Sequence, residues 1–292
     1  MPHLPPGERL DRRLNRLAWV AVALMLVVVL ASAWLRLAQP RPICHDWPGC
    51  RTATHAPGPL METGPNRLLT LARAAHRGAA SALLLVAIAL TVLTGRQPTR
   101  DTGTRAHALT LLLLALALAV LGVVTPGSRA APVLLGNQIG GLVMLALAWR
   151  LLRRLQLGAA PDQLASRPRR WPGQRVAVLM LSAGGALVWL TQAAVGALSG
   201  SSRHAGAPVA HLALALLALS LAAAAGWAAH RQGRRAEGGA LLVLVTLQAL
   251  LGAAAAGGAA IPPLVLAHAA MAAVGIALLS GLTAVARVSP QV

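Results

Sequence analysis

Residues 106–125 read AHALTLLLLALALAVLGVVT, a run that no charged side chain interrupts. At ~1.5 Å per residue, a helix of this length crosses the roughly 30 Å hydrocarbon core of a membrane. Seven other stretches are similar, and the predicted spans are 17–37, 70–94, 106–125, 132–152, 175–198, 208–229, 239–259 and 262–286. The chain has 292 residues and is 57% hydrophobic, so we expect an all-α polytopic membrane protein rather than a soluble domain. The first span is too long for a signal peptide and lacks a small-residue cleavage site, so it should remain as a helix.

The positive charge is concentrated in alternate connections between the spans. The net charge is +19, and the arginines cluster before the first span and near residues 96–105, 150–175 and 231–235. By the positive-inside rule, these connections and both termini lie in the cytoplasm, and the protein is expected in a bacterial inner membrane. The charge is therefore assigned to topology and contact with membrane lipid rather than to nucleic acid.

The longest of the predicted cytoplasmic connections covers residues 153–174 and is rich in Arg and Pro. It separates an N-terminal four-helix half, residues 1–152, from a C-terminal half, residues 175–292. Because four spans return the chain to its starting side, the halves can be parallel repeats. The predicted architecture is two pseudo-symmetric four-helix bundles related by an axis along the membrane normal.

A pattern of three residues occurs twice in the C-terminal half: a glutamine, a glycine four residues later, and a histidine early in the next span. The two sets are Gln192, Gly196 and His211, and Gln248, Gly252 and His268. Ionisable side chains inside apolar spans are costly and usually functional, so the paired histidines indicate two ligands of one cofactor, with haem iron the natural candidate. The alternative is a histidine that hydrogen-bonds a backbone carbonyl of a neighbouring helix. We expect the glutamines to bond between helices and the glycines to permit close packing.

The N-terminal half contains partial counterparts of this pattern. His76 opens the second span as His211 opens the sixth, and Gly122 in the third span corresponds to the two glycines. His76, His211 and His268 lie a few residues inside spans that start at the outer face, so they are predicted to face the bundle interior ~5–15 Å below that surface.

The first outer loop reads Cys44-His-Asp-Trp-Pro-Gly-Cys50 and contains both cysteines of the chain. On the oxidising side of the membrane, with Pro48 and Gly49 able to turn the chain, the two thiols can form a disulfide. A metal site with His45 and Asp46 is the alternative, although four well-spaced ligands are not evident.

Taken together, these features resemble the haem A synthase family. The resemblance is carried by the cysteine loop, His76-Arg77 early in the second span, His204-Ala-Gly after the fifth, and the paired His211 and His268. It covers nearly the whole chain. It implies that haem b lies in the C-terminal half between His211 and His268, while the N-terminal half takes haem O and oxidises a ring methyl to a formyl group, giving haem A for cytochrome oxidase.

The resemblance also implies roles for residues of the N-terminal half and the outer loops. His76 is expected to bind the substrate iron and, with Arg73, to serve catalysis. Arg77 and His204 are expected to bind the cofactor, arginine being well suited to haem propionates. Haem O synthase, cytochrome oxidase assembly proteins and a second copy of the chain are the expected protein partners.

Three departures from the family lie in the N-terminal half. Arg73 replaces the usual glutamate before His76, Leu118 replaces a glutamine, and the fourth span has Asn137 and Gln138 where a histidine is usual. The alternative function is therefore a haem-binding cytochrome oxidase assembly factor without oxidation activity. A quinone-linked cytochrome with two haems predicts four interior histidines where this chain has three, and a transporter would purify without colour.

Overall fold

The computed structural model describes residues 6–38, 67–97, 101–125, 130–158, 172–199, 207–256 and 262–284. In these ranges the chain forms only helices, with no strand: α1 (Pro6–Ala38), α2 (Arg67–Gly95), α3 (Thr102–Val124), α4 (Ala131–Gly158), α6 (Pro172–Ser199), α7 (Ala207–Arg231), α8 (Arg235–Ala256) and α9 (Pro262–Leu282). All eight of these are long and apolar enough to cross a membrane. The all-α, multi-pass membrane fold predicted from the sequence is confirmed.

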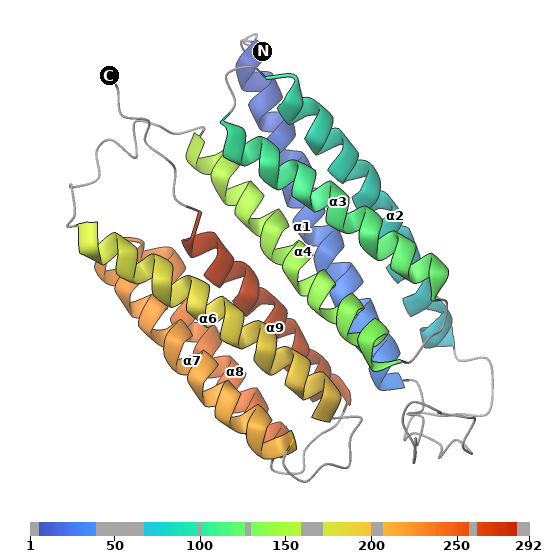
Figure 1. Cartoon of the computed structure of the whole chain (residues 1–292), viewed down its shortest axis with the longest axis vertical. Helices are drawn as coiled ribbons and strands as arrows, with labels where there is room; N and C mark the ends of the chain where they lie inside the picture. Colours follow the sequence, from blue (N-terminus) through green and yellow to red (C-terminus); the bar gives the residue numbers. More distant parts are fainter. Residues whose placement is uncertain are drawn as a thin grey trace.

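The helices pack in two rings that touch along α4 and α9 (Figure 1). In the first ring α1 contacts α2 and α4, and α3 contacts α2 and α4; in the second, α6 contacts α7 and α9, and α8 contacts α7 and α9. Between the rings, α9 contacts α4 and α1, and α4 also contacts α6. The contacts between the rings are symmetric. If α1 is exchanged with α6 and α4 with α9, the contact of α1 with α9 becomes that of α6 with α4, and the contact of α4 with α9 stays the same. Such a pattern is expected of two repeats.

Alanines are frequent in the helix interfaces beside buried Leu, Met and Trp side chains, and many large aliphatic residues are exposed on the outside. Ala18, Ala108 and Ala222 are fully buried, whereas Leu85 is 69% exposed and Val123 is 78% exposed. In lipid, outward Leu and Val lose nothing, while small interface residues let helix backbones approach and gain van der Waals contact. This distribution is the one expected of a membrane bundle.

Several helices extend past their predicted spans at the arginine-rich end. The structure has α1 beginning at Pro6 rather than near residue 17, and α4 ending at Gly158 rather than near 152. Apolar windows stop at the first charges, but Leu and Arg are good helix formers, so the backbone continues helically beyond the hydrocarbon. The last residues of the predicted spans 239–259 and 262–286 lie outside the described part.

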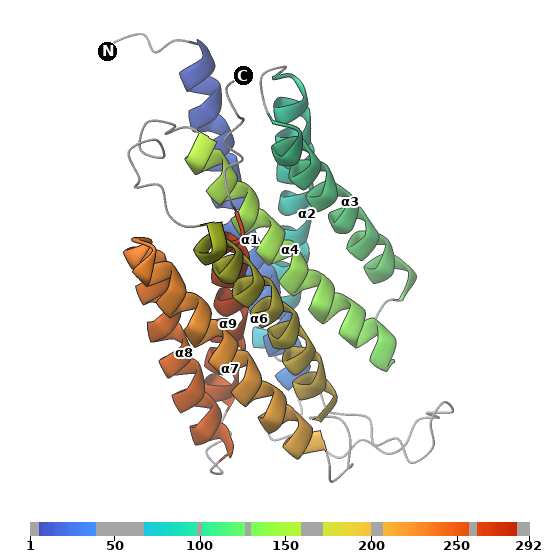
Figure 2. The same cartoon turned by 60° about the vertical axis from the view of Figure 1, so that its left-hand side comes forward.

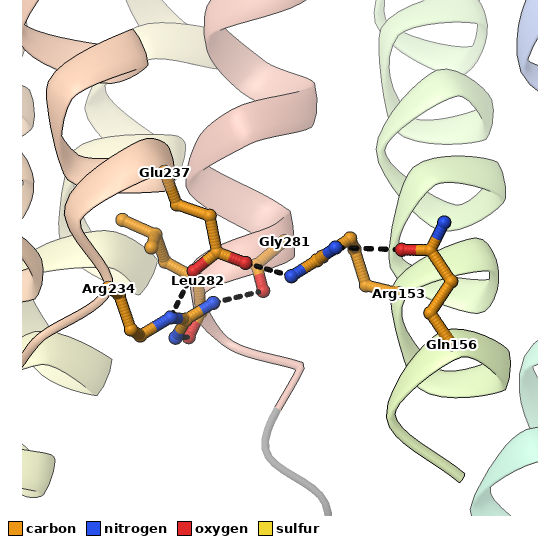
Figure 3. Close-up of polar contacts among 6 residues, drawn as sticks. All are labelled: Arg153, Gln156, Arg234, Glu237, Gly281 and Leu282. Carbon is orange, nitrogen blue, oxygen red and sulfur yellow. Dashed lines mark hydrogen bonds and ion pairs between the residues drawn. The ribbon is translucent and has the colours of Figure 1, made fainter. Parts of the chain in front are cut away.

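An ion-pair cluster joins the two rings at this end, between α4 and the α8–α9 side (Figure 3). Glu237 pairs with Arg153 of α4 and with Arg234, which precedes α8. Arg234 also donates to the carbonyl oxygens of Leu282 at 2.8 Å and Gly281 at 3.2 Å, so it caps the end of α9. The free carbonyl groups at a helix C-terminus attract cations, which explains why the guanidinium of Arg234 lies at the end of α9.

Candidate functional site

The glutamine, glycine and histidine of the first repeated set meet where α6 packs against α7. A Cβ atom at Gly196 would lie 2.6 Å from His211 Cε1 and 2.9 Å from its Nδ1, so the imidazole rests directly on the glycine backbone. Gln192 lies one turn earlier on α6 and is buried, while His211 is half-buried. The close packing expected at this glycine is present, and the group packed against it is the histidine.

Three contacts with Gln192 surround the ring of His211. Its Nδ1 lies 3.2 Å from the backbone oxygen of Gln192, to which it can donate. The side-chain Nε2 of Gln192 lies 3.2 Å from His211 Nε2 and 3.5 Å from its Nδ1, and it can donate to the ring nitrogen that carries no proton. When the proton is on Nδ1, the backbone contact accepts it and the lone pair is on Nε2. A histidine whose Nδ1–H is held by a backbone carbonyl has the usual tautomer of a metal ligand bound through Nε2.

The second set repeats the arrangement where α8 packs against α9. The side-chain Nε2 of Gln248 lies 3.2 Å from His268 Nε2, and a Cβ at Gly252 would lie 3.3 Å from His268 Cε1. One difference concerns His268 Nδ1 and Gln248 Oε1, which are both buried and have no hydrogen-bond partner. An unpaired buried polar atom costs about 1–3 kcal/mol, so the second set is less well satisfied than the first.

The two histidines lie at the same end of the second ring and on its diagonal. His211 and His268 follow the starts of α7 and α9, which run in the same direction because one helix separates them (Figure 2). In a ring of four, α7 and α9 face each other across the axis, and these two helices do touch. Diagonal helices commonly supply the paired ligands of cofactors held inside four-helix bundles.

The predicted residues of the N-terminal half are arranged differently. His76 of α2 is half-buried, and its Nδ1 lies 3.3 Å from the backbone oxygen of Val28 on α1. This contact is the hydrogen bond to a neighbouring carbonyl that the sequence left open as an alternative. Arg73 and Arg77 are exposed on α2. The structure therefore places His76 between helices and the two arginines on the outside of α2.

The third copy of the pattern, in α3 and α4, does not form the same contacts. A Cβ at Gly122 would meet nothing within 4 Å, whereas Gly196 and Gly252 each lie against a histidine. Leu118, at the glutamine position, packs on Gly140 of α4 instead. The correspondence of Gly122 with the two other glycines therefore holds in sequence but not in packing, because α4 has no imidazole to place against it.

Gln138, at the histidine position of α4, makes a contact that sequence reasoning missed. Its side-chain Nε2 donates to the backbone oxygen of Ala193 on α6, 3.1 Å away in the other ring. Ala193 directly follows Gln192, whose own carbonyl contacts His211. The position was visible in the sequence, but nothing there indicated that its partner is in the other half of the chain.

Three predicted site residues lie outside the described part of the chain: Cys44 and Cys50 with their predicted disulfide, and His204.

The donor set at α6–α9 consists of two imidazoles. Among the described residues, no three His, Cys, Asp or Glu side chains gather to hold a bare metal ion. His211 and His268 come from two different helices, and each ring lies against a glycine. Two histidines would be enough to hold the iron of a haem, which needs fewer protein ligands than a bare metal ion. The unpaired polar atoms at His268 and Gln248 are compatible with that group.

No family model matches this chain, and no curated protein matches it at a significant level. An assignment of function therefore rests on the residues and contacts described above.

Proposed function

We propose that this chain is a membrane haem protein of the haem A synthase type, holding haem b in its C-terminal half between His211 and His268. The observation that supports this most is the repeated contact of glutamine, glycine and histidine, at α6–α7 and again at α8–α9. One such contact would be explained by helix association alone. Two equivalent contacts, on diagonal helices and at the same end, are what a shared ligand between the histidines requires.

The surrounding residues would prepare both rings to bind iron. With its proton on Nδ1, His211 would donate to the Gln192 carbonyl, and Nε2 would be the ligand atom. The amide of each glutamine donates to Nε2, and rotation of this flexible side chain frees the lone pair. Gly196 and Gly252 leave room for the rings to lie flat on the helix backbone. Bound there, haem b supplies a one-electron redox centre.

For the N-terminal half we propose that haem O is the substrate and haem A the product. His76 would bind the iron through Nε2, since its Nδ1 already contacts the Val28 carbonyl. Arg73 and Arg77 bracket His76 on α2, and their guanidinium groups suit the carboxylates of haem propionates. Arg73 lies one turn before His76 on α2, and its exposed guanidinium would add positive charge beside a haem bound at His76. Conversion of a methyl to a formyl group takes one oxygen atom from water and releases four protons and four electrons, so the reaction needs water and an electron acceptor that the chain itself does not supply.

A second candidate function is favoured by the packing around Gly122. The contact of glutamine, glycine and histidine is missing between α3 and α4. The first ring therefore has one histidine for a substrate, His76, whereas the second ring has two histidines for a ligand. A haem-binding cytochrome oxidase assembly factor would need only the C-terminal site. Under this second candidate, the chain keeps haem b and does not oxidise haem O.

Haem content separates these possibilities. The full-length protein would be expressed with a haem O synthase, purified, and its haems extracted and separated, with a reduced-minus-oxidised spectrum of the intact protein. The variants are His211→Ala with His268→Ala, His76→Ala, and His230→Ala as a control on the opposite end of α7. Haem b with haem O or haem A, and loss of haem b alone in the double variant, is the expected result for the synthase. Haem b alone in the wild type supports the assembly factor, and a colourless wild type refutes both.

We also propose the orientation and location of the chain. The arginine-rich end, which includes Arg153 and Arg234, faces the cytoplasm of a bacterium, with both termini on that side. His211 and His268 then lie toward the outer face of the inner membrane. Cysteine accessibility, measured with membrane-impermeant reagents on single cysteines placed at Arg235 and Thr125, tests this orientation.

A further inference from the structure

The arginine-rich ends of α3 and α4 bring several cationic side chains together. Arg154 of α4 reaches Asp101, the N-cap residue of α3, at 2.5 Å. Its guanidinium lies over Gly103, where a Cβ atom would collide with it. This ion pair is mostly at the surface, since the Asp101 side chain is 54% exposed. It fixes the register between the two antiparallel helices.

One helical turn deeper, Arg150 and His107 lie at the same level. Arg150 precedes Arg154 by one turn on α4, and His107 follows Gly103 by one turn on α3, which runs in the opposite direction. The Nδ1 of His107 bonds to the Gly103 carbonyl at 2.6 Å, which leaves Nε2 for another partner. Electrostatic interactions connect His107 with both arginines and Arg150 with Arg154, so these groups form one cluster.

Within this cluster Arg150 has no partner of opposite charge. Among the described residues, Asp101 is the one carboxylate that interacts with the group, and it already accepts from Arg154 and Thr104. In the described part of the chain Arg150 makes no hydrogen bond or ion pair, although it is half-buried and its Nε is fully shielded from solvent. By contrast, Arg153, on the same helix, is paired with Glu237 (Figure 3).

We propose that Arg150, with Arg154 and His107, binds the phosphate of an anionic phospholipid in the leaflet on the arginine-rich side. A phosphate oxygen accepts readily from a guanidinium, and a half-buried, unpaired Arg at the membrane boundary is otherwise poorly solvated. The apolar neighbourhood suits a lipid rather than a soluble anion. Beside His107 an exposed stripe of α3 begins, along which acyl chains can pack: Leu109, Leu113, Leu116 and Val120.

The expected strength follows from the charges. Attraction between a basic side chain and an anionic leaflet is worth ≈ 1 kcal/mol per Arg, and this energy corresponds to about a fivefold change in affinity. Removing Arg150 alone should therefore weaken binding of an anionic lipid about fivefold. A zwitterionic lipid, which carries the same phosphate with a compensating charge, should bind more weakly than an anionic one and respond less to the substitution.

Native mass spectrometry of the delipidated full-length protein tests this site. Phosphatidylglycerol, phosphatidylcholine and inorganic phosphate are titrated separately against the wild type, Arg150→Gln and Arg235→Gln. Arg235 is exposed at the same end of the molecule, at the start of α8, so its variant removes the same charge without touching the cluster. We expect Arg150→Gln to weaken phosphatidylglycerol binding about fivefold and Arg235→Gln to change it less than twofold.

Each outcome decides the matter. Equal weakening by the two variants would mean that only the overall charge attracts lipid, and unchanged binding in Arg150→Gln would remove the site. Saturable binding of inorganic phosphate without phosphatidylglycerol would assign the cluster to a free anion and overturn the lipid. If Arg150→Gln does not fold, a photoactivatable phosphatidylglycerol on the wild type should label peptides of α3 and α4. Labelling elsewhere alone would refute the proposal.

Discussion

Substitution of Gly196 by alanine should destabilise the protein, although alanine is the better helix former. The added Cβ would lie 2.6 Å from His211 Cε1, where ordinary contact begins at 3.4 Å, so the ring must move by about 0.8 Å. A shift of that size would break the 3.2 Å bond from His211 Nδ1 to the Gln192 carbonyl. Overpacking costs about 1–3 kcal/mol and an interhelical hydrogen bond about 0.6 kcal/mol.

Two other glycines provide a graded comparison. A Cβ at Gly184, on the same helix, would meet nothing within 4 Å, so Gly184→Ala should gain the ~0.5–1 kcal/mol of helix propensity. A Cβ at Gly252 would lie 3.3 Å from His268, a contact that a small adjustment relieves. The costs sum to about 1.6–3.6 kcal/mol, so after the same gain is subtracted Gly196→Ala should lose about 1–3 kcal/mol, and Gly252→Ala should fall between the other two.

The assay is thermal unfolding of the purified protein in detergent, followed by tryptophan fluorescence. For a chain of 292 residues, a difference of about 2 kcal/mol between Gly196→Ala and Gly184→Ala corresponds to roughly 3 °C in Tm. If both variants change Tm in the same direction and by the same amount, the reasoning is wrong, because the His211 ring would not be confined by this glycine. Under the proposed function, Gly196→Ala should also alter the haem b spectrum, while Gly184→Ala should leave it unchanged.

Three further substitutions test other contacts, each by Tm in detergent. Glu237→Gln removes the carboxylate that pairs with Arg153 and Arg234, and both guanidinium groups remain largely shielded from solvent, so this variant should lose about 1–2 kcal/mol of stability. Glu8→Gln, at an exposed site, is the control and should change stability by less than about 0.5 kcal/mol. Trp189→Ala should cost about 3–5 kcal/mol, because this indole is 1% exposed and donates to a carbonyl of α9 at 3.0 Å; a loss below 1 kcal/mol would contradict its burial. Burial by itself raises the pKa of Asp101, but hydrogen bonds from Thr104 and Arg154 outweigh it and hold the pKa below the ordinary carboxyl value. Its stabilisation is thus present above about pH 4 and is lost as pH falls through the lowered pKa. Asp101→Asn should therefore lower Tm slightly at pH 7, and this difference should shrink as pH falls below about 4; a pH-independent difference would exclude the charge as its cause.

Hydropathy was sufficient to predict the fold class and the number of described spans. Residues 106–125 can be stable in hydrocarbon only as a helix, because every backbone N–H and C=O must be satisfied within the segment. The helix ends were less well predicted, and the error was largest at α1, where the charged residues before 17 are helical but not apolar. The apolar pattern reports contact with lipid, and the helix backbone is free to continue beyond it.

The repeated spacing also allowed part of the candidate site to be anticipated. Because consecutive spans are antiparallel and similar in length, a glycine near the end of one and a histidine near the start of the next fall at the same depth. Gly196 and His211 meet for this reason, as do Gly252 and His268. The same spacing led us to expect that Gly122 packs like Gly196 and Gly252, which it does not. Spacing gives the depth of a residue along its helix and not the direction that the residue faces.

The amino-acid sequence by itself determined that the chain is a helical membrane protein, and it singled out His211 and His268 as a pair. Only the tertiary structure decided which helix faces meet: Gln138 with the Ala193 carbonyl, Glu237 with Arg153. The physical reason is that lipid and a neighbouring helix are about equally apolar, so hydropathy does not distinguish one face of a helix from another. Contacts between residues far apart in the chain become evident only in the packed arrangement of the helices.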